Sequence, residues 1–291
     1  MPDESAGSAQ NVSVDPLDAD WIGACRRIVA AHHELFARDR TIAGRTVYDG
    51  RGEGGDRTLV IDRRAEDAVF EELEGLHASG HEFTAVSEER GTVGFGNRGS
   101  SALVVIDPID GSLNARRTLP SHSFSLAVAS GPTMGEVEFA YVYDFGAGEE
   151  FTARRGQGAK LDGEPIRAEG PGYGLEVVGI EAAKPERIVP MLEELEGKAF
   201  RIRAIGSIAI MLCYVAAGRL DGALTARGCR SVDAAAAQLI AREAGAALEF
   251  PGFENWSAAL DLVARYHVTA ALDAELLSTL RPVQERAEKV G

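Results

Sequence analysis

The stretch VVIDPIDGSLNA, residues 104–115, constrains the fold more than any other part of the chain. It opens with three apolar residues that predict a buried strand, and Asp107 and Asp110 follow directly. Carboxylates are costly to bury without a partner, so we expect this strand to end at a sheet edge where both acids have a role. Gly111 and Ser112 come next, and a Gly-Ser turn leading into a short helix offers backbone N–H groups and a hydroxyl to an anion.

The hydrophobic pattern on either side of this stretch predicts an α/β (α+β) protein. Two amphipathic helices are expected first, then short strands that form a largely antiparallel sheet, then an alternation of strands and helices. The expected helices span residues 21–36, 62–76, 185–197, 207–218 and 232–245. The expected strands span residues 82–87, 101–107, 123–129, 136–144, 175–180, 201–205, 219–226 and 246–250, with a hairpin over 149–166.

Composition narrows the class of protein. The 291 residues are 45% hydrophobic, and no apolar run approaches the roughly 18 residues that a membrane helix needs. The formal charge of −15 disfavours nucleic acid and anionic membranes as partners. Three widely separated cysteines, Cys25, Cys213 and Cys229, indicate neither a disulfide framework nor a zinc site. We therefore expect a cytoplasmic protein with an acidic, disordered tail over residues 1–17 and one domain over 18–291, whose two lobes divide near residue 175.

Acidic residues gather at the ends of apolar segments, at Glu88, Glu89, Asp107, Asp110 and Asp233. Several carboxylates at one sheet edge would repel one another unless a cation neutralised them. No His or Cys accompanies them, and ligation by oxygen alone favours Mg²⁺. Taken singly, these acids are also compatible with a helix cap, a turn or a solvated pair.

Two other classes of phosphate-binding protein are excluded by their sequence motifs. Phosphatases of the haloacid dehalogenase type use two Asp separated by one residue, whereas two residues separate Asp107 from Asp110. The Walker loop GxxxxGK[ST] is absent.

Three separated motifs together resemble the inositol monophosphatase family, within the superfamily that includes fructose-1,6-bisphosphatase. They are SEE at 87–89, DPIDGS at 107–112 and VDAAAAQLIAREAG at 232–245, and the hairpin at 149–166 is similar to that of the family. The resemblance extends from about Trp21 to Leu280. It implies a layered αβαβα sandwich and hydrolysis of phosphate monoesters with Mg²⁺, two or three ions, as cofactor.

The resemblance also implies roles for individual residues. Glu88, Asp107 and the Ile109 carbonyl match the ligands of a first Mg²⁺, and Asp107, Asp110 and Asp233 match those of a second. Ile109, Asp110, Gly111 and Ser112 match residues that border the phosphate. Ser112 stands where the family usually has Thr, whose hydroxyl orients the attacking water. Asp56 matches the acid that pairs with this hydroxyl, although the Thr expected three residues before Asp62 is Leu59.

The substrate side departs from the inositol-binding pattern. The family's Glu seven residues before the Asp that matches Asp233 is Ala226 here, and its Trp directly before that Asp is Val232. Arg227 and Arg230 are equally compatible with surface charge and with contact to a second anionic group of a substrate. The segment Gly206, Ser207, Ile208 matches one that lines the family's substrate pocket.

These observations predict a metal-dependent phosphatase for a small sugar or polyol phosphate, acting as a homodimer. Fructose-1,6-bisphosphate and a nucleotide 3′-phosphate are alternative substrates. A non-catalytic, metal-binding regulatory relative is the alternative from another class, and the intact set of acids argues against it.

Overall fold

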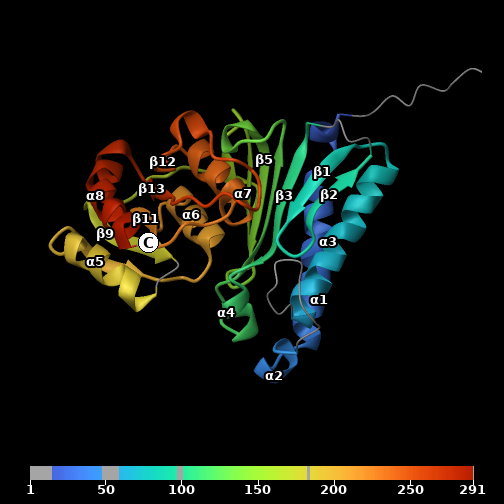
Figure 1. Ribbon diagram of the computed structural model, residues 1–291, viewed down its shortest axis with the longest axis horizontal. Coiled ribbons are helices and arrows are strands. Elements are labelled where there is room, and N and C mark those ends of the chain that lie inside the picture. Colours follow the sequence, from blue (N-terminus) through green and yellow to red (C-terminus); the bar gives the residue numbers. More distant parts are fainter. Residues whose placement is uncertain (1–14, 48–58, 97–100, 182–183, 291) are drawn as a thin grey trace, which may run out of the picture.

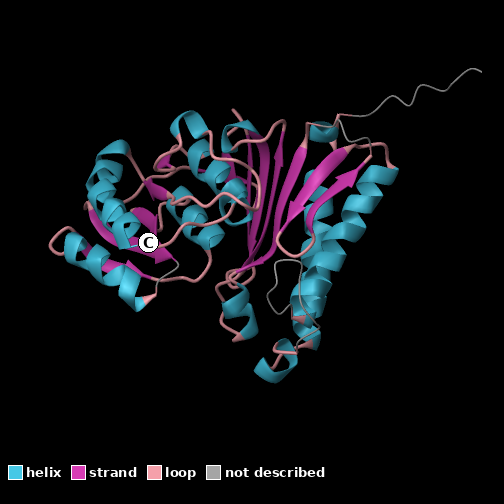
Figure 2. Cartoon of the chain, in the orientation of Figure 1, coloured by secondary structure: helices cyan, strands magenta, loops and turns pink. Residues whose placement is uncertain are grey.

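The computed structural model describes residues 15–47, 59–96, 101–181 and 184–290 as two β-sheets with helices on and between them (Figures 1 and 2). The helices are α1 (Trp21–Arg38), α2 (Ile42–Arg45), α3 (Val60–Ala78), α4 (Ser112–Arg116), α5 (Pro185–Leu195), α6 (Ile208–Ala216), α7 (Ser231–Glu243) and α8 (Ala274–Val290). Short 3-10 turns cover Pro16–Asp18, Met134–Glu136 and Glu254–Trp256.

The first sheet has eight strands in the order β2-β1-β3-β4-β5-β6-β7-β8. They are β1 (Phe83–Ser87), β2 (Gly91–Phe95), β3 (Leu103–Asp110), β4 (Ser123–Ala129), β5 (Val137–Asp144), β6 (Glu149–Arg154), β7 (Ala159–Leu161) and β8 (Glu164–Ile166). β1 and β3 run parallel, and the other neighbours are antiparallel, which confirms the largely antiparallel sheet.

The second sheet has five strands in the order β10-β9-β11-β13-β12. They are β9 (Leu175–Glu181), β10 (Ala199–Arg203), β11 (Gly222–Thr225), β12 (Ala247–Glu249) and β13 (Thr269–Ala271). β9 lies parallel to both β10 and β11, and β13 is antiparallel to its neighbours. The strands of the two sheets do not interleave along the chain, since β8 ends at Ile166 and β9 begins at Leu175.

Five layers follow from the packing, as the resemblance predicted (Figure 1). α1 and α3 pack against each other and cover one face of the first sheet, α6 and α7 lie between the sheets, and α5 and α8 cover the far face of the second sheet. The described helices include none with the length and apolar character that crossing a membrane requires.

Helix α7 can occupy the middle layer because its side chains are small. Its residues Ala234–Ala237 are all buried, and the helix contacts β3, β4, β5, β6 and β7 of the first sheet as well as α6 and β12. α3 instead buries one stripe, including Ala65, Val69 and Leu73, against α1 and the sheet. A helix of a middle layer is expected to be buried on all sides, as α7 is, and a helix of an outer layer on one side, as α3 is.

Two parts of the domain prediction stay untested. Residues 1–14 of the expected tail lie outside the described residues, while Pro16–Asp18 form a 3-10 turn whose Pro16 carbonyl accepts a hydrogen bond from Trp21 Nε1 at 2.7 Å. The division into two lobes near residue 175 remains a prediction as well. All three cysteines are buried and free.

Candidate metal and phosphate site

A β-bulge explains how one strand presents two acids to the same site. Asp107 pairs with Ser125 of β4 and Asp110 with Ser123, so three steps along β3 oppose two steps along β4. Side chains alternate between the two faces of a regular strand, and residues three apart would therefore point in opposite directions. The extra residue of a bulge re-aims the chain, so that both carboxylates reach the sheet edge.

The two carboxylates are each fixed through one oxygen. Asp107 Oδ1 accepts a hydrogen bond from the Ile109 N–H at 3.0 Å. Asp110 Oδ2 accepts from the Ser207 hydroxyl at 2.6 Å and from the Ala209 N–H at 2.7 Å. Ser207 and Ala209 belong to the start of α6, so Asp110 also ties β3 to the middle layer.

Glu88 and Asp233 complete the acidic group. Glu88 follows β1, the parallel neighbour of β3, and Asp233 lies in the first turn of α7. Carboxylate oxygens of Glu88, Asp107 and Asp233 lie within 4.8 Å of one another. These three, predicted as ligands from separate motifs, are thus brought together by β1, β3 and α7. Asp110 borders them from the side of α6.

The electrostatics of this group favour a cation. Burial, followed by the charges of Glu88, Asp110 and Asp233, raises the pKa of Asp107 well above its usual value. Burial and the charge of Asp233 raise the pKa of Asp110 to about 7, against the opposing effect of its hydrogen bonds from α6. Groups that resist ionisation for these reasons are stabilised as anions when a divalent cation neutralises them. All the donors are oxygens, as Mg²⁺ prefers, so these residues fit the ion that the family implies.

Gly111 and Gly206 bring the turn after β3 against the loop before α6. Gly111 has φ +86°, and a Cβ there would lie 2.9 Å from the Gly206 carbonyl and 3.0 Å from that of Ser121. Asn114 of α4 joins the two segments, since its Nδ2 donates to the Ser121 and Ile205 carbonyls at 2.7 Å each. Larger side chains at either glycine would push these segments apart.

Ser112 borders a small cavity together with Asp62, Glu88 and Asp107. Asp62 lies in the first turn of α3. Burial, then the charges of Glu89 and Glu88, raise its pKa to about 7. Asp56, the predicted partner of Ser112, lies outside the described residues. Sequence reasoning used Asp62 only as a reference position and missed that it faces the site, although its place beside the expected start of the second helix was a usable signal.

On the other side of the acids, Asp110 and Asp233 line a cavity of about 400 Å³. Its wall includes Gly206 and Ile208 of the predicted substrate segment. Glu181 at the end of β9 holds this wall, because its carboxylate accepts hydrogen bonds from the Ile205 and Gly206 N–H groups at 2.6 to 2.9 Å. Buried Ser207 caps α6 rather than lining the cavity.

The two arginines considered for substrate contact differ in position. Arg227 is exposed, whereas Arg230 is partly buried at the N-cap of α7. The Arg230 Nη2 atom lies 2.6 Å from Glu88 Oε1 and 3.6 Å from Asp233 Oδ1. Arg230 therefore contacts the predicted metal ligands, and its role toward a substrate stays a prediction.

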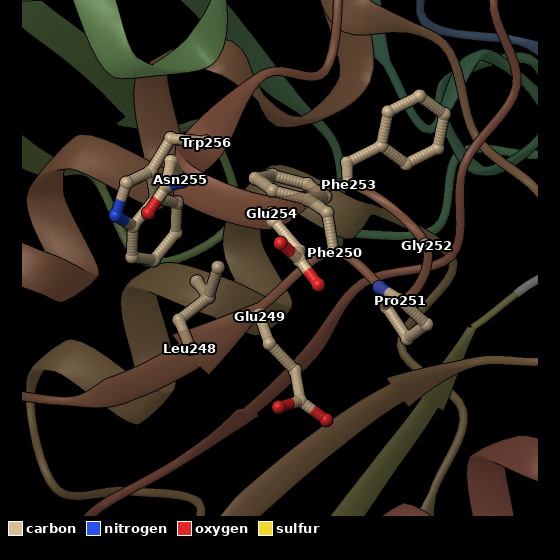
Figure 3. A pocket seen from close by; sticks show the side chains of 9 residues that line it. All are labelled: Leu248, Glu249, Phe250, Pro251, Gly252, Phe253, Glu254, Asn255 and Trp256. Carbon is tan, nitrogen blue, oxygen red and sulfur yellow. The ribbon is translucent and has the colours of Figure 1, made fainter.

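A separate cavity of about 390 Å³ has a different character (Figure 3). It is formed by the single segment 248–256 and is bordered by the rings of Phe250, Phe253 and Trp256, with Glu249 and Glu254. None of the predicted site residues lines it. The candidate site is accordingly the acidic region at the end of β3.

Comparison with known sequences identifies relatives over most of the chain. The profile of the inositol monophosphatase family matches residues 14–285. A Thermococcus kodakarensis protein named fructose-1,6-bisphosphatase/inositol-1-monophosphatase is 33% identical over 232 residues, 79% of this chain and 84% of that protein. The Nus factor SuhB of Pasteurella multocida is 34% identical over 234 residues, 78% of this chain and 83% of the relative.

Solved structures give the same grouping. The crystal structure of an inositol monophosphatase-fructose 1,6 bisphosphatase is similar with a TM-score of 0.78 and 27% identity, covering 91% of this chain and 100% of that one. An IMPase from Thermotoga maritima gives a TM-score of 0.72 and 26% identity, covering 93% and 98% of the two chains.

Proposed function

Because the chain belongs to the inositol monophosphatase family, as its motifs predicted, we propose that it is a Mg²⁺-dependent phosphatase for a small sugar or polyol phosphate. The family makes the chain a phosphatase of the inositol monophosphatase and fructose-1,6-bisphosphatase group. The observation that carries the finer proposal is the convergence of Glu88, Asp107 and Asp233 within 4.8 Å.

The acids of this site would hold the ions. Glu88, Asp107 and the Ile109 carbonyl would hold one Mg²⁺, and Asp107, Asp110 and Asp233 a second. When bound, such ions lower the pKa of a coordinated water and stabilise the charge on the leaving oxygen. The hydrogen bonds to Asp107 and Asp110 support this role, because they fix each carboxylate before an ion arrives.

Ser112 and Asp62 would handle the proton of the attacking water. Both border the small cavity that also contains Glu88 and Asp107. The Ser112 hydroxyl would orient the water and pass its proton toward Asp62, whose pKa of about 7 suits a group that exchanges a proton near neutral pH. Asp62 is thus a second candidate for this proton beside Asp56, which lies outside the described residues and stays a prediction.

The cavity of about 400 Å³ beside Asp110 and Asp233 would hold the organic part of the substrate. Ala226 offers no side-chain hydrogen bond to a polyol, so selectivity for an inositol ring is expected to be weak. Exposed Arg227 is available to a second phosphate. Fructose-1,6-bisphosphate and a nucleotide 3′-phosphate are therefore included as candidate substrates.

A second candidate is a regulatory protein without turnover, since one relative is named Nus factor SuhB. The complete set of acids favours the enzyme. We also propose a homodimer and a cytoplasmic location, and the charge of −15 argues against direct binding of nucleic acid.

The test is release of phosphate by the purified protein from inositol-1-phosphate, fructose-1,6-bisphosphate and a nucleotide 3′-phosphate, with Mg²⁺ and with EDTA. We expect turnover of at least one ester that requires Mg²⁺ and is abolished in Asp110→Asn. Arg227→Ala should lower kcat/KM for the bisphosphate but not for the monophosphates. Phosphate release that persists in EDTA, or in Asp110→Asn, would contradict the proposed mechanism.

A further inference from the structure

Arg230 places a permanent positive charge inside the acidic group. Its Nη2 donates to Glu88 Oε1 at 2.6 Å and lies 3.6 Å from Asp233 Oδ1. Its backbone N–H donates to the other oxygen of Asp233, Oδ2, at 2.8 Å. One residue thus contacts two of the three carboxylates that converge within 4.8 Å, and its backbone bond anchors it there.

The Arg230 contacts compete with cation binding. A guanidinium stays protonated at any pH that the protein experiences, so it is a fixed charge. The lone pairs of Glu88 that accept its N–H are on a carboxylate that would also ligate Mg²⁺. Two cations that share one carboxylate repel each other strongly at such distances in a partly buried setting.

The geometry differs from that of an ordinary surface ion pair. Arg219 and Glu149 form such a pair, with two hydrogen bonds of 2.6 and 2.8 Å between one guanidinium and one carboxylate. Arg230 instead joins Glu88, which follows a strand of the first sheet, to Asp233 of α7. The Arg230 side chain is 29% exposed and that of Arg219 36%, so the two pairs differ in their partners rather than in exposure.

We propose that Arg230 is a built-in counter-cation of the acidic site, which neutralises Glu88 and Asp233 and which a divalent ion must displace from Glu88 in order to bind. This inference rests on the metal site of the proposed function. Removing the guanidinium should have two opposite effects: tighter binding of a divalent ion, and lower stability of the protein without one. A purely structural ion pair would produce only the second effect.

The experiment measures Mn²⁺ binding by calorimetry and thermal unfolding in EDTA for the full chain and for Arg230→Gln. We expect Arg230→Gln to bind Mn²⁺ roughly 10-fold more tightly and to unfold in EDTA about 2–4 °C lower. Added Mn²⁺ should raise its unfolding temperature more than that of the parent. The gain in affinity should shrink as the salt concentration rises.

Two further variants sharpen the test. Arg219→Gln removes an Arg-Glu pair of similar exposure and should lower stability without changing the Kd for Mn²⁺. Arg230→Lys keeps the charge and should bind Mn²⁺ with a Kd between those of the parent and Arg230→Gln. Arg230→Met, which also removes the charge, replaces Arg230→Gln if that variant does not fold. Equal or weaker Mn²⁺ binding by the variant that removes the charge would overturn the counter-cation role alone. If no form bound Mn²⁺, the metal site of the proposed function would fall with it.

Discussion

Helices α3 and α7 each carry an aspartate in the first turn that faces the same site, yet they reach it from different layers. Asp233 enters from the middle layer, on a helix buried against both neighbouring layers. Asp62 enters from the outer layer, on a helix with an exposed side. In the proposed function the two helices would therefore have different roles: α7 would supply one ligand of the ions, and α3 would supply the proton acceptor.

The largest effect should come from Asp233→Asn. Removing an anionic ligand leaves a divalent ion poorly held, and kcat/KM should fall roughly 10³-fold or more. Mn²⁺ affinity, measured by calorimetry, should fall as well, while circular dichroism should show a retained fold. Unchanged Mn²⁺ affinity would remove Asp233 from the ligand set and with it the division between the helices.

Asp62→Asn should act on turnover but not on the ion. We expect kcat to fall roughly 10²-fold, the scale of a positioned proton acceptor, with the Kd for Mn²⁺ unchanged. Ser112→Ala should give a similar loss, and the double variant should be little worse than either single one, because the two groups act on one proton. A weakened Kd in Asp62→Asn would instead make Asp62 a metal ligand.

A larger side chain should destabilise the buried helix α7 more than the outer helix α3. Ala237 of α7 is fully buried, so Ala237→Leu should lower the free energy of unfolding by about 1–3 kcal/mol through overpacking. Glu74 of α3 is exposed and serves as the control position. Glu74→Leu should change the free energy of unfolding by less than about 0.5 kcal/mol. Urea denaturation of both variants provides the measurement, and equal losses would contradict the contrast between layers.

Low pH should reduce the free energy of unfolding through His32 of α1 in the outer layer. Its Nε2 lies 3.0 Å from the Ala65 carbonyl of α3. Burial lowers the pKa of His32 from 6.5 to about 4. Between pH 4 and pH 6.5 the unfolded chain binds a proton at His32 that the folded chain does not. The contribution of His32 to the free energy of unfolding is therefore complete above pH 6.5 and is lost as the pH falls toward 4. Within that range, His32 should make the free energy of unfolding fall by up to about 1.4 kcal/mol per pH unit.

His32→Gln keeps a donor for Ala65 but cannot titrate. Its free energy of unfolding, measured by urea at pH 7 and pH 5, should therefore decrease less on acidification than that of the parent. Another buried histidine, His122, has a pKa that burial also lowers to about 4, and it remains in both proteins. Equal decreases in the parent and His32→Gln would show that His32 does not control the acid sensitivity.

The smallest effect should come from the exposed ion pair between the outer helices. Arg27 Nε of α1 lies 2.9 Å from Glu72 of α3, and the Arg27 side chain is 55% exposed. Arg27→Ala should lower the free energy of unfolding by no more than about 1 kcal/mol, and less in high salt. A larger loss would mean that the outer layer depends on its surface charges.

Local patterns predicted much of this molecule, and the misses have physical causes. The apolar run before Asp107 and the Ala-rich segment of α7 gave the right elements, because their periodicity comes from burial. The structure contains β2, β13 and α8, which the sequence analysis did not include. β2 and β13 are five and three residues long, and so short a strand is defined by its neighbours rather than by its own pattern.

The site shows the same limit. The other acids of the site could be predicted because they occur in sequence motifs. Asp62 belongs to none of these motifs, and only the fold brings it to the same cavity as Ser112. The pairing of Arg230 with Glu88 joins residues 142 positions apart (230 − 88), and no local pattern contains it. The bulge in β3 likewise depends on how β4 pairs with it.

The amide of Asn114 has a consequence for heat inactivation. Its two hydrogen bonds, to Ser121 and Ile205, join the turn after β3 to the loop that walls the proposed substrate cavity. Those two segments belong to different layers, and neither layer needs the amide to keep its own secondary structure. Warming that separates them would disassemble the catalytic centre while both sheets persist, so the loss of enzymatic activity should precede the loss of circular dichroism as the temperature rises.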